Sequence, residues 1–315
     1  MNNFDINFKT KIKEVFKNTI DFLNRHDLEW WACGGTAIGA VRHQDMIPWD
    51  DDVDIYMPRT SYNKLLTLLN ELKEETGYKC LSIQNDFGYN HAFAKIFDPN
   101  TTIWEQKLFP YVYGVWVDIF ILDKYEFGTW KFYSDQKKYA KIFQNYQVLI
   151  ADYSLANIVY AFLHCHFNAF RNMLLSKLAT KKYKLRKYHE FVKHDISIQT
   201  DYGVNMVGYS EGVAAVFGME WFSDYRTEKF GSFEIKLPVG NHQYLTHLYG
   251  DYMTPPPENK RYSGHSMVYV NLQEGLTMEE VRKRIKAGEK STEYISNHGE
   301  MLNFTIFRRK YNTWN

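Results

Sequence analysis

Four acidic side chains fall within five positions of this 315-residue chain, in the segment Asp50–Asp54. At neutral pH such a run repels itself unless water or a cation neutralises it. Side chains two positions apart on a strand share a face, so we expect Asp52 and Asp54 to project together while Val53 and Ile55 face the core. Two parallel carboxylates can hold Mg²⁺, a hard cation that takes oxygen ligands. The alternative is a solvated acidic turn beside a strand.

A pair of glycines favours the first interpretation. Gly34 and Gly35 precede Thr36 and separate a short apolar strand, expected over 29–33, from a short helix, expected over 36–43. Glycines in this position let backbone N–H groups approach a phosphate, and the helix start adds a favourable dipole. The alternative is an ordinary turn.

A third carboxylate, Asp118, stands alone in a strongly apolar strand expected over 115–122. A buried, uncompensated carboxylate is costly, and a metal ion shared with Asp52 and Asp54 would compensate it. Alternatively, Asp118 points to solvent from an edge strand. The sequence therefore leaves both a three-aspartate site and an edge position open.

The elements that must position these side chains alternate between helix and strand. Apolar residues recur at three- and four-residue steps over 8–23, which predicts a helix packed on a core. Another helix, capped by Ser61 and ended by Gly77, is expected over 61–72, and further strands are expected over 53–57, 79–83 and 92–97. This order predicts an α+β fold: a core with a mixed β-sheet flanked by helices.

Three regions are expected along the chain. Residues 1–125 would form the catalytic core, 126–200 a helical insertion, and 201–315 a C-terminal part that completes the active site. The insertion is expected because 129–194 contains neither Gly nor Pro and is rich in Lys, Tyr and Leu. In the last region, strands are expected over 213–217 and 233–237, and helices over 243–249 and 278–286. A basic tail, 308–310, is expected to be a solvated end.

The composition limits the class of protein. With 38 Lys and Arg against 37 Asp and Glu, the formal charge is +1, which argues against a nucleic-acid-binding protein. Cys33, Cys80 and Cys165 are widely separated, so neither a disulfide framework nor a zinc ribbon is predicted. The sequence starts without a secretory-signal pattern and has no eighteen-residue apolar run, which predicts a cytoplasmic protein.

The segment 148–194 has a separate signal. Its first part is moderately apolar, and eight Lys and Arg against a single Glu follow between 171 and 194. An apolar face beside a basic run is typical of a helix that lies on an anionic membrane, here the inner face of the cell membrane. A solvated basic face on a packed helical pair is the alternative.

The motifs together resemble the LicD family, which includes phosphocholine transferases and the fukutin-related proteins. The resemblance rests on the segments 34–43, 47–55 and 57–59, on Ala94–Asp98 and Val117–Phe120, and on 248–253 with the prolines 255–257, Arg261 and His265. It covers 30–265 in separate segments. The order of a glycine pair and three carboxylates is similar to the nucleotidyltransferase-like superfamily, although sixteen residues between Gly35 and Asp52 make an unusually long gap.

The resemblance implies a metal-dependent phosphotransferase with a nucleotidyltransferase-like core. Such an enzyme moves a phosphorylated alcohol, most often phosphocholine, from a CDP-activated donor to a hydroxyl of a cell-surface glycan such as lipopolysaccharide or teichoic acid. The acceptor would be the glycan or a lipid-linked oligosaccharide, and CMP would leave in an in-line displacement. Two Mg²⁺ or Mn²⁺ ions would stabilise the attacking and leaving oxygens.

The resemblance also assigns roles to residues. Asp52, Asp54 and Asp118 would be both metal ligands and catalytic residues, and Asp118 is a candidate for accepting the acceptor's proton. The donor would be bound by residues of the matched segments: Gly34, Gly35, Thr36, Arg42, Lys95, Arg261 and His265. His265 is equally compatible with a structural contact. Asp50 is expected to support the metal ligands, whereas Trp49 either frames the ion site or packs in the core.

Two rival functions remain open at this point. A nucleotidyltransferase would use the same carboxylates to attack the phosphorus attached to the nucleoside and would release pyrophosphate. A relative could also carry ribitol phosphate, glycerol phosphate or a sugar phosphate. A non-catalytic binding protein is disfavoured because all three aspartates are present.

Overall fold

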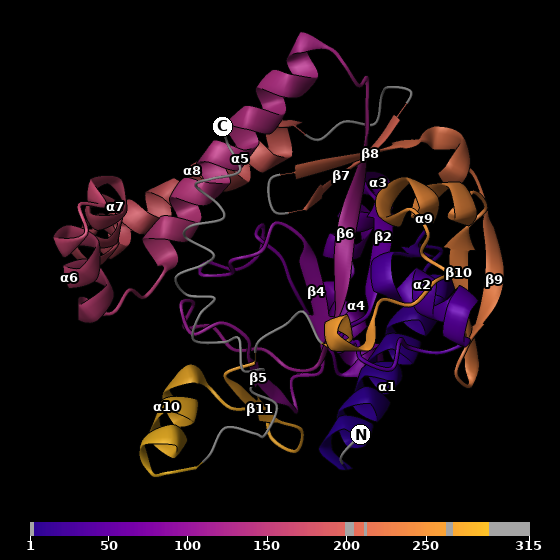
Figure 1. Cartoon of the computed structure of the whole chain (residues 1–315), viewed down its shortest axis with the longest axis horizontal. Coiled ribbons are helices and arrows are strands. Elements are labelled where there is room, and N and C mark those ends of the chain that lie inside the picture. The colour runs from indigo at the N-terminus through magenta and orange to yellow at the C-terminus, as the bar shows by residue number, and fades with distance from the viewer. Residues whose placement is uncertain (1–2, 199–204, 211–212, 263–266, 290–315) are drawn as a thin grey trace.

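A mixed β-sheet forms the centre of the molecule. The computed structural model describes residues 3–198, 205–210, 213–262 and 267–289 (Figure 1). In this part of the chain, the main sheet has seven strands. Five run in the order β1 (Trp31–Ala32), β2 (Asp54–Pro58), β6 (Trp116–Tyr125), β4 (Ala94–Phe97), β3 (Lys79–Leu81). The second half of β6 pairs with β7 (Asn205–Ser210), which pairs with β8 (Val213–Gly218). Only the β2–β6 pair of the described sheet is parallel.

The helices on the core include α1 (Asn3–Arg25), α2 (Gly34–His43), α3 (Arg59–Thr67), α4 (Leu69–Thr76) and α9 (Asn241–Tyr249). The predicted apolar stripe of the first helix is confirmed, because each of its members is buried: Phe8, Ile12, Val15, Phe16, Ile20, Leu23. The α+β class predicted from the sequence is confirmed as well.

Four helices extend to one side of the sheet: α5 (Trp130–Ile150), α6 (Leu155–Leu163), α7 (Phe167–Leu178) and α8 (Lys181–Ile198) (Figure 1). The side chains of Thr129 and Ser154 cap the starts of α5 and α6. Aromatic side chains of α5 pack against Phe191 of α8. Among the described residues, no helix combines the length and apolar character needed to cross a bilayer.

Smaller elements complete the fold. β9 (Tyr225–Phe230) pairs with β10 (Phe233–Pro238), and β5 (Thr102–Trp104) pairs with β11 (Tyr269–Asn271). Short 3₁₀ turns occupy Met219–Phe222 and Glu258–Lys260, and α10 (Met278–Lys286) is the last helix described. The basic tail 308–310 lies outside the described residues. The division of the chain into three regions stays a prediction.

Two local predictions were wrong. Ser61 does not cap a helix: α3 begins at Arg59, and the Ser61 hydroxyl instead accepts a hydrogen bond from the backbone of Glu29. The expected single helix is also broken at Leu68 into α3 and α4, although Gly77 ends α4 as predicted, in the left-handed conformation. No Gly or Pro marks the break in the sequence, so composition gave no signal for it.

A buried ion pair fixes α3 to β6. The Arg59 guanidinium donates to both carboxylate oxygens of Asp123 at 2.8 Å, and Asp123 is fully buried. Removing one partner leaves an uncompensated charge in the interior. Asp123→Ala is therefore expected to lower the free energy of unfolding by about 3–5 kcal/mol, measured by urea denaturation.

A surface pair provides the control for this prediction. Asp21 pairs with Lys17 on α1, and both side chains are exposed. Asp21→Ala should cost at most about 1 kcal/mol. A loss for Asp123→Ala as small as that of the control would show that the buried pair adds nothing to stability.

Candidate active site

The strand register brings two of the three predicted aspartates together. Asp54 opens β2 and lies directly beside Asp118 of the parallel strand β6. On the other side of Asp118, the antiparallel strand β4 places Lys95. Because β6 has neighbours on both sides, the edge-strand alternative for Asp118 is wrong. Adjacent positions across a sheet share a face, so the three charged side chains form a row.

Asp52 completes a group of three carboxylates. Asp52 precedes β2, and oxygens of Asp52, Asp54 and Asp118 lie within 4.8 Å of one another. Asp118 is only 3% exposed, whereas the other two are half-buried. The intervening Val53 and the following Ile55 are fully buried, which confirms the predicted alternation. The three aspartates thus converge as expected.

The glycine pair gives these carboxylates room. Gly34 has φ +53°, and a Cβ on it would lie 3.3 Å from Oδ2 of Asp54. A Cβ on Gly35 would lie 2.4 Å from an oxygen of Asp50, which is too close for a side chain. Both glycines lie inside α2 rather than before it, so its predicted start at Thr36 was two residues late.

The hydrogen bonds of the α2 start also orient the site. The Thr36 hydroxyl accepts a hydrogen bond from the Asp54 N–H at 2.8 Å. The Gly34 N–H donates to the Tyr244 hydroxyl at 2.9 Å. In this structure Gly34 and Thr36 therefore contact the protein itself, and their binding of a phosphate stays a prediction.

Lys95 is buried beside the aspartates. Its side chain is 1% exposed, and its Nζ lies 2.6 Å from Oδ1 of Asp118. The Trp116 ring lies against the same ammonium group at 4.2 Å, and Phe93 and Tyr113 add two more aromatic contacts. This position favours a role in holding Asp118 rather than the predicted contact with the donor phosphate, which stays untested.

Glu105 is a second buried carboxylate near Lys95. Its Oε2 lies 3.8 Å from the Lys95 Nζ and 3.7 Å from the His91 ring, and the Tyr113 hydroxyl donates to it. Burial raises the pKa of Asp118, and Glu105 raises it further, whereas Lys95 opposes the shift. The ammonium group of Lys95 is therefore shared by two buried carboxylates, those of Asp118 and Glu105.

Two arginines flank the aromatic ring that precedes the aspartates. The Arg42 guanidinium lies 5.8 Å from the Trp49 ring centroid, and that of Arg261 lies 5.2 Å from it. The pKa of Arg42 is lowered by burial and by the charge of Arg261, and Asp50 acts in the opposite direction. The repulsion between two guanidinium groups makes this place favourable for an anion.

The remaining predicted residues are placed as follows. Arg42 also donates to the Tyr252 carbonyl oxygen at 2.7 Å, and Arg261 donates to that of Pro256 at 2.8 Å. Asp50 forms a second acidic group with Asp51 and Asp52. His265 lies outside the described residues.

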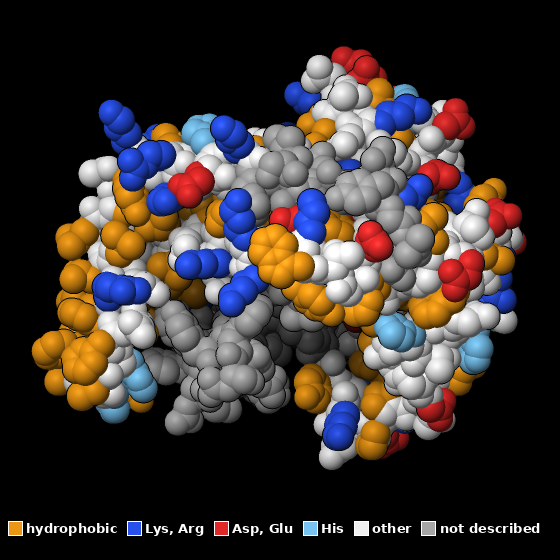
Figure 2. Space-filling model, turned by 90° about the horizontal axis from the view of Figure 1, so that it is seen from above, with side chains coloured by type: hydrophobic (Ala, Val, Ile, Leu, Met, Phe, Trp, Pro, Cys, Tyr) orange, Lys and Arg blue, Asp and Glu red, His pale blue; other side chains and the backbone are white. Residues whose placement is uncertain are grey.

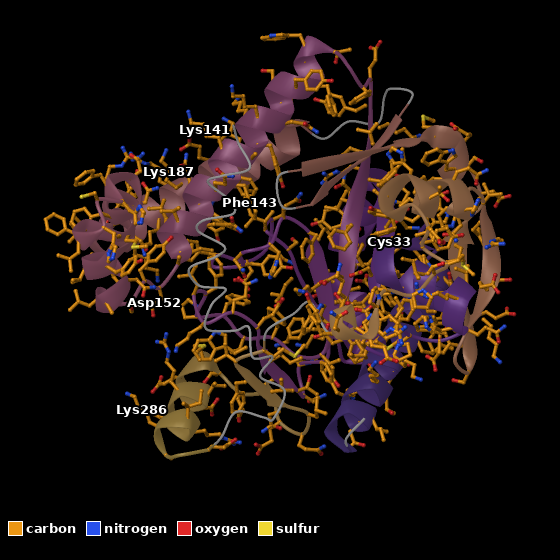
Figure 3. All side chains as sticks on the ribbon, in the orientation of Figure 1. Cys33, Lys141, Phe143, Asp152, Lys187 and Lys286 are labelled. Atoms are coloured by element: carbon orange, nitrogen blue, oxygen red, sulfur yellow. The ribbon has the colours of Figure 1, made fainter. Side chains whose placement is uncertain are left out.

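Two residues near the carboxylates were missed in the sequence. Cys33 lies buried at the start of α2, where burial and the charges of the three aspartates raise the pKa of its thiol (Figure 3). Tyr249 lies on α9, and its hydroxyl is 3.6 Å from the position that a Cβ on Gly34 would take. The only signal for Tyr249 in the sequence was its position in the segment 248–253, which resembles the LicD family.

The site fits a hard divalent cation. Its donor set consists of the carboxylate oxygens of three aspartates, and one of these aspartates, Asp118, forms an ion pair with Lys95. Mg²⁺ or Mn²⁺ is the kind of ion that such an oxygen set prefers.

Comparison with known proteins shows what part of the chain is similar to. Residues 27–146 match the family described as "LicD/FKTN/FKRP, nucleotidyltransferase domain", and this range contains all three aspartates. The resemblance to the LicD family predicted from the motifs is therefore confirmed.

Particular relatives agree with this class. The chain is 28% identical over 260 residues to "Lipopolysaccharide cholinephosphotransferase LicD" of Haemophilus influenzae, covering 80% of this chain and 93% of that protein. The chain also has a shorter match to "Ribitol 5-phosphate transferase FKRP" of Homo sapiens. The two are 39% identical over 44 residues, which covers 14% of this chain and 9% of that protein. These relatives support a phosphotransferase of the LicD type.

Proposed function

We propose that this protein transfers a phosphorylated alcohol from a CDP-activated donor to a hydroxyl of a cell-surface glycan, with release of CMP. The proposal rests on the convergence of Asp52, Asp54 and Asp118. It rests also on Arg42 and Arg261, whose guanidinium groups both lie over the Trp49 ring. Carboxylates for a cation next to guanidinium groups for phosphate form a suitable site for a diphosphate.

Each residue has a definite task in this proposal. Asp52, Asp54 and Asp118 would hold Mg²⁺ or Mn²⁺, and the ion would neutralise charge on the diphosphate and on the leaving CMP. Arg42 and Arg261 would bind phosphate oxygens and orient the donor. Phosphoryl transfer depends mainly on such positioning and charge neutralisation.

The reaction would be a displacement at the donor's distal phosphorus. The acceptor oxygen forms a bond to this phosphorus while the bond to the bridging oxygen breaks, and CMP leaves with that oxygen. The acceptor proton would pass to the carboxylate of Asp118. Lys95 would keep Asp118 in place throughout.

Phosphocholine is the first choice of cargo. The relative that spans most of this chain has a cholinephosphotransferase name, whereas the ribitol-phosphate relative matches only 14% of it. The residues around the carboxylates would contact the diphosphate, which all CDP-alcohols share. The choice between choline, ribitol and glycerol therefore needs experiment.

A thermal-shift panel tests the donor and the ion together. We expect CDP-choline with Mg²⁺ to raise the melting temperature, since a ligand at a hundred times its Kd stabilises by about 2.7 kcal/mol. CDP-ribitol and CDP-glycerol test the other cargoes, and CTP tests a nucleotidyltransferase. Asp54→Asn should lose the response to Mg²⁺.

The products of turnover separate the two reaction types. Release of CMP is expected, and release of pyrophosphate from CTP would favour the nucleotidyltransferase. No melting shift with any cytidine nucleotide, with or without Mg²⁺, would overturn the proposed donor class.

A further inference from the structure

Helix α6 is apolar on nearly every side, yet most of it faces water. Of its nine residues only Ile158 and Ala161 are buried. Leu155, Phe162 and Leu163 are 75%, 54% and 68% exposed. A helix that is hydrophobic all round is normally covered by protein or lipid. The packing of the described chain does not cover this one.

Helix α7 extends the same surface. Exposed apolar side chains continue from Leu163, at the end of α6, to Phe167 and along α7. Together, half of the large hydrophobic side chains exposed in the described chain belong to these two helices: Leu155, Val159, Tyr160, Phe162, Leu163, Phe167, Leu174, Leu175, Leu178. We call this set the α6–α7 surface. Concentration on one helix pair is unlike the scattered exposure that is normal for a protein surface.

Basic side chains lie next to the α6–α7 surface. Eight Lys and Arg against one Glu fall between 171 and 193, although the whole chain has a formal charge of only +1. Figure 2 shows hydrophobic side chains gathered at the left end, where α6 and α7 lie in Figure 1, with Lys and Arg side chains beside them. In Figure 3, Lys187 and Asp152 lie in this helical part, away from Cys33 in the core.

Some of this positive charge is compensated within the protein. Asp152 pairs with Lys177 at 2.6 Å and with Arg282 of α10 at 3.2 Å. Lys187 pairs with Glu190. Lys181 and Lys182, at the start of α8, are exposed. The region as a whole therefore keeps an excess of positive charge next to an uncovered apolar surface.

We propose that the α6–α7 surface docks on a membrane that contains anionic phospholipids, with its apolar side chains in the interface and the basic side chains of α7 and α8 against the lipid phosphates. Apolar burial and attraction to anionic lipids are the two contributions that hold an interfacial helix. A second copy of the chain is a poorer occupant, because a two-fold contact would bring the two basic regions together. This docking does not depend on the proposed transferase reaction.

A native cysteine offers a direct probe. Cys165 is exposed in the turn between α6 and α7, whereas Cys33 and Cys80 are buried. An environment-sensitive fluorophore on Cys165 of the full chain should shift its emission to shorter wavelength with vesicles of phosphatidylcholine and phosphatidylglycerol. Pure phosphatidylcholine vesicles should give a much smaller shift. Cys165→Ser controls for labelling elsewhere.

Substitutions separate the apolar and the charged contributions. Leu163→Ser should weaken vesicle binding roughly tenfold, because one large apolar side chain no longer leaves water. The control is Val239→Ser, which should have no effect. Val239 is 51% exposed and directly follows β10, which lies on the opposite side of the molecule from α6 (Figure 1). Lys181→Glu with Lys182→Glu should weaken binding roughly tenfold or more, as should high salt.

Several outcomes would overturn the proposal. The first is an unchanged emission with anionic vesicles, and the second is equal binding by Leu163→Ser and Val239→Ser. Without vesicles, a blue-shifted emission that depends on protein concentration would assign the surface to a second copy. If that emission were independent of concentration, the chain's own residues would cover the surface. Circular dichroism of each variant checks that the fold is kept.

Discussion

Asp54→Asn is expected to reduce CMP release by about 10²–10³-fold or more while the protein stays folded. The substitution keeps the size of the side chain. It removes one negative charge from a group of three carboxylates whose oxygens lie within 4.8 Å of one another. The backbone bonds that fix Asp54, to Thr36 and to Cys33, involve its N–H and carbonyl groups and survive the change. Turnover with the preferred CDP-alcohol measures the loss.

A neighbouring aspartate supplies the control. Asp45 lies on the same connection between α2 and β2, but it pairs with Lys13 on the surface. Asp45→Asn should keep nearly full activity. If the Asp54→Asn variant had the same turnover as this control and its melting temperature still responded to Mg²⁺, Asp54 would have no place in the metal site.

Lys95→Met is expected to have the largest effect on stability at the site. The variant leaves the carboxylates of Asp118 and Glu105 in the interior without their shared cation. Breaking a buried pair in this way lowers the free energy of unfolding by about 3–5 kcal/mol. Urea denaturation without added metal measures the loss.

The pH dependence of that loss has a definite sign. Burial already raises the pKa of Asp118, and removal of Lys95 takes away the group that opposes the shift. The folded variant would thus bind a proton that the unfolded chain releases at lower pH. Its stability is greatest below the ordinary pKa of an aspartate and falls as the pH rises towards the raised pKa. The deficit relative to the unsubstituted protein should therefore grow from acidic to neutral pH.

A double variant identifies the partner of Lys95. Lys95→Met with Asp118→Asn removes both charges of the 2.6 Å pair and should recover part of the lost stability. If Lys95→Met alone left the stability unchanged and raised the KM for the donor, Lys95 would not be needed to hold Asp118. That result would restore the interpretation of Lys95 as a phosphate-binding residue.

The sequence predicted the three aspartates because local rules determine their positions. The two-residue period of a strand puts Asp52 and Asp54 on one face, and the apolar residues around Asp118 place it on a buried strand. The contacts of the site were less predictable, because they join distant segments. Glu105 reaches Lys95 only through folding of the loop after β5, and Tyr249 belongs to α9.

Strand prediction failed where apolar periodicity was weak. β9 carries mostly polar, exposed side chains, and β5 is only three residues long. Neither gives the alternating pattern on which a prediction depends. In contrast, the bounds of α10, Met278–Lys286, agree with the prediction because a capping box at Thr277 and a clear apolar face mark it.

The side-by-side register of Asp54 and Asp118 has a consequence for how such genes can diverge. Inserting or deleting one codon just before Asp54, or between Trp116 and Asp118 in β6, would turn that carboxylate to the opposite face of the sheet. The connection from Arg59 to Trp116, in contrast, includes surface turns that tolerate changes in length. Descendants of this sequence can therefore gain or lose residues between the two strands while the aspartates keep their alignment.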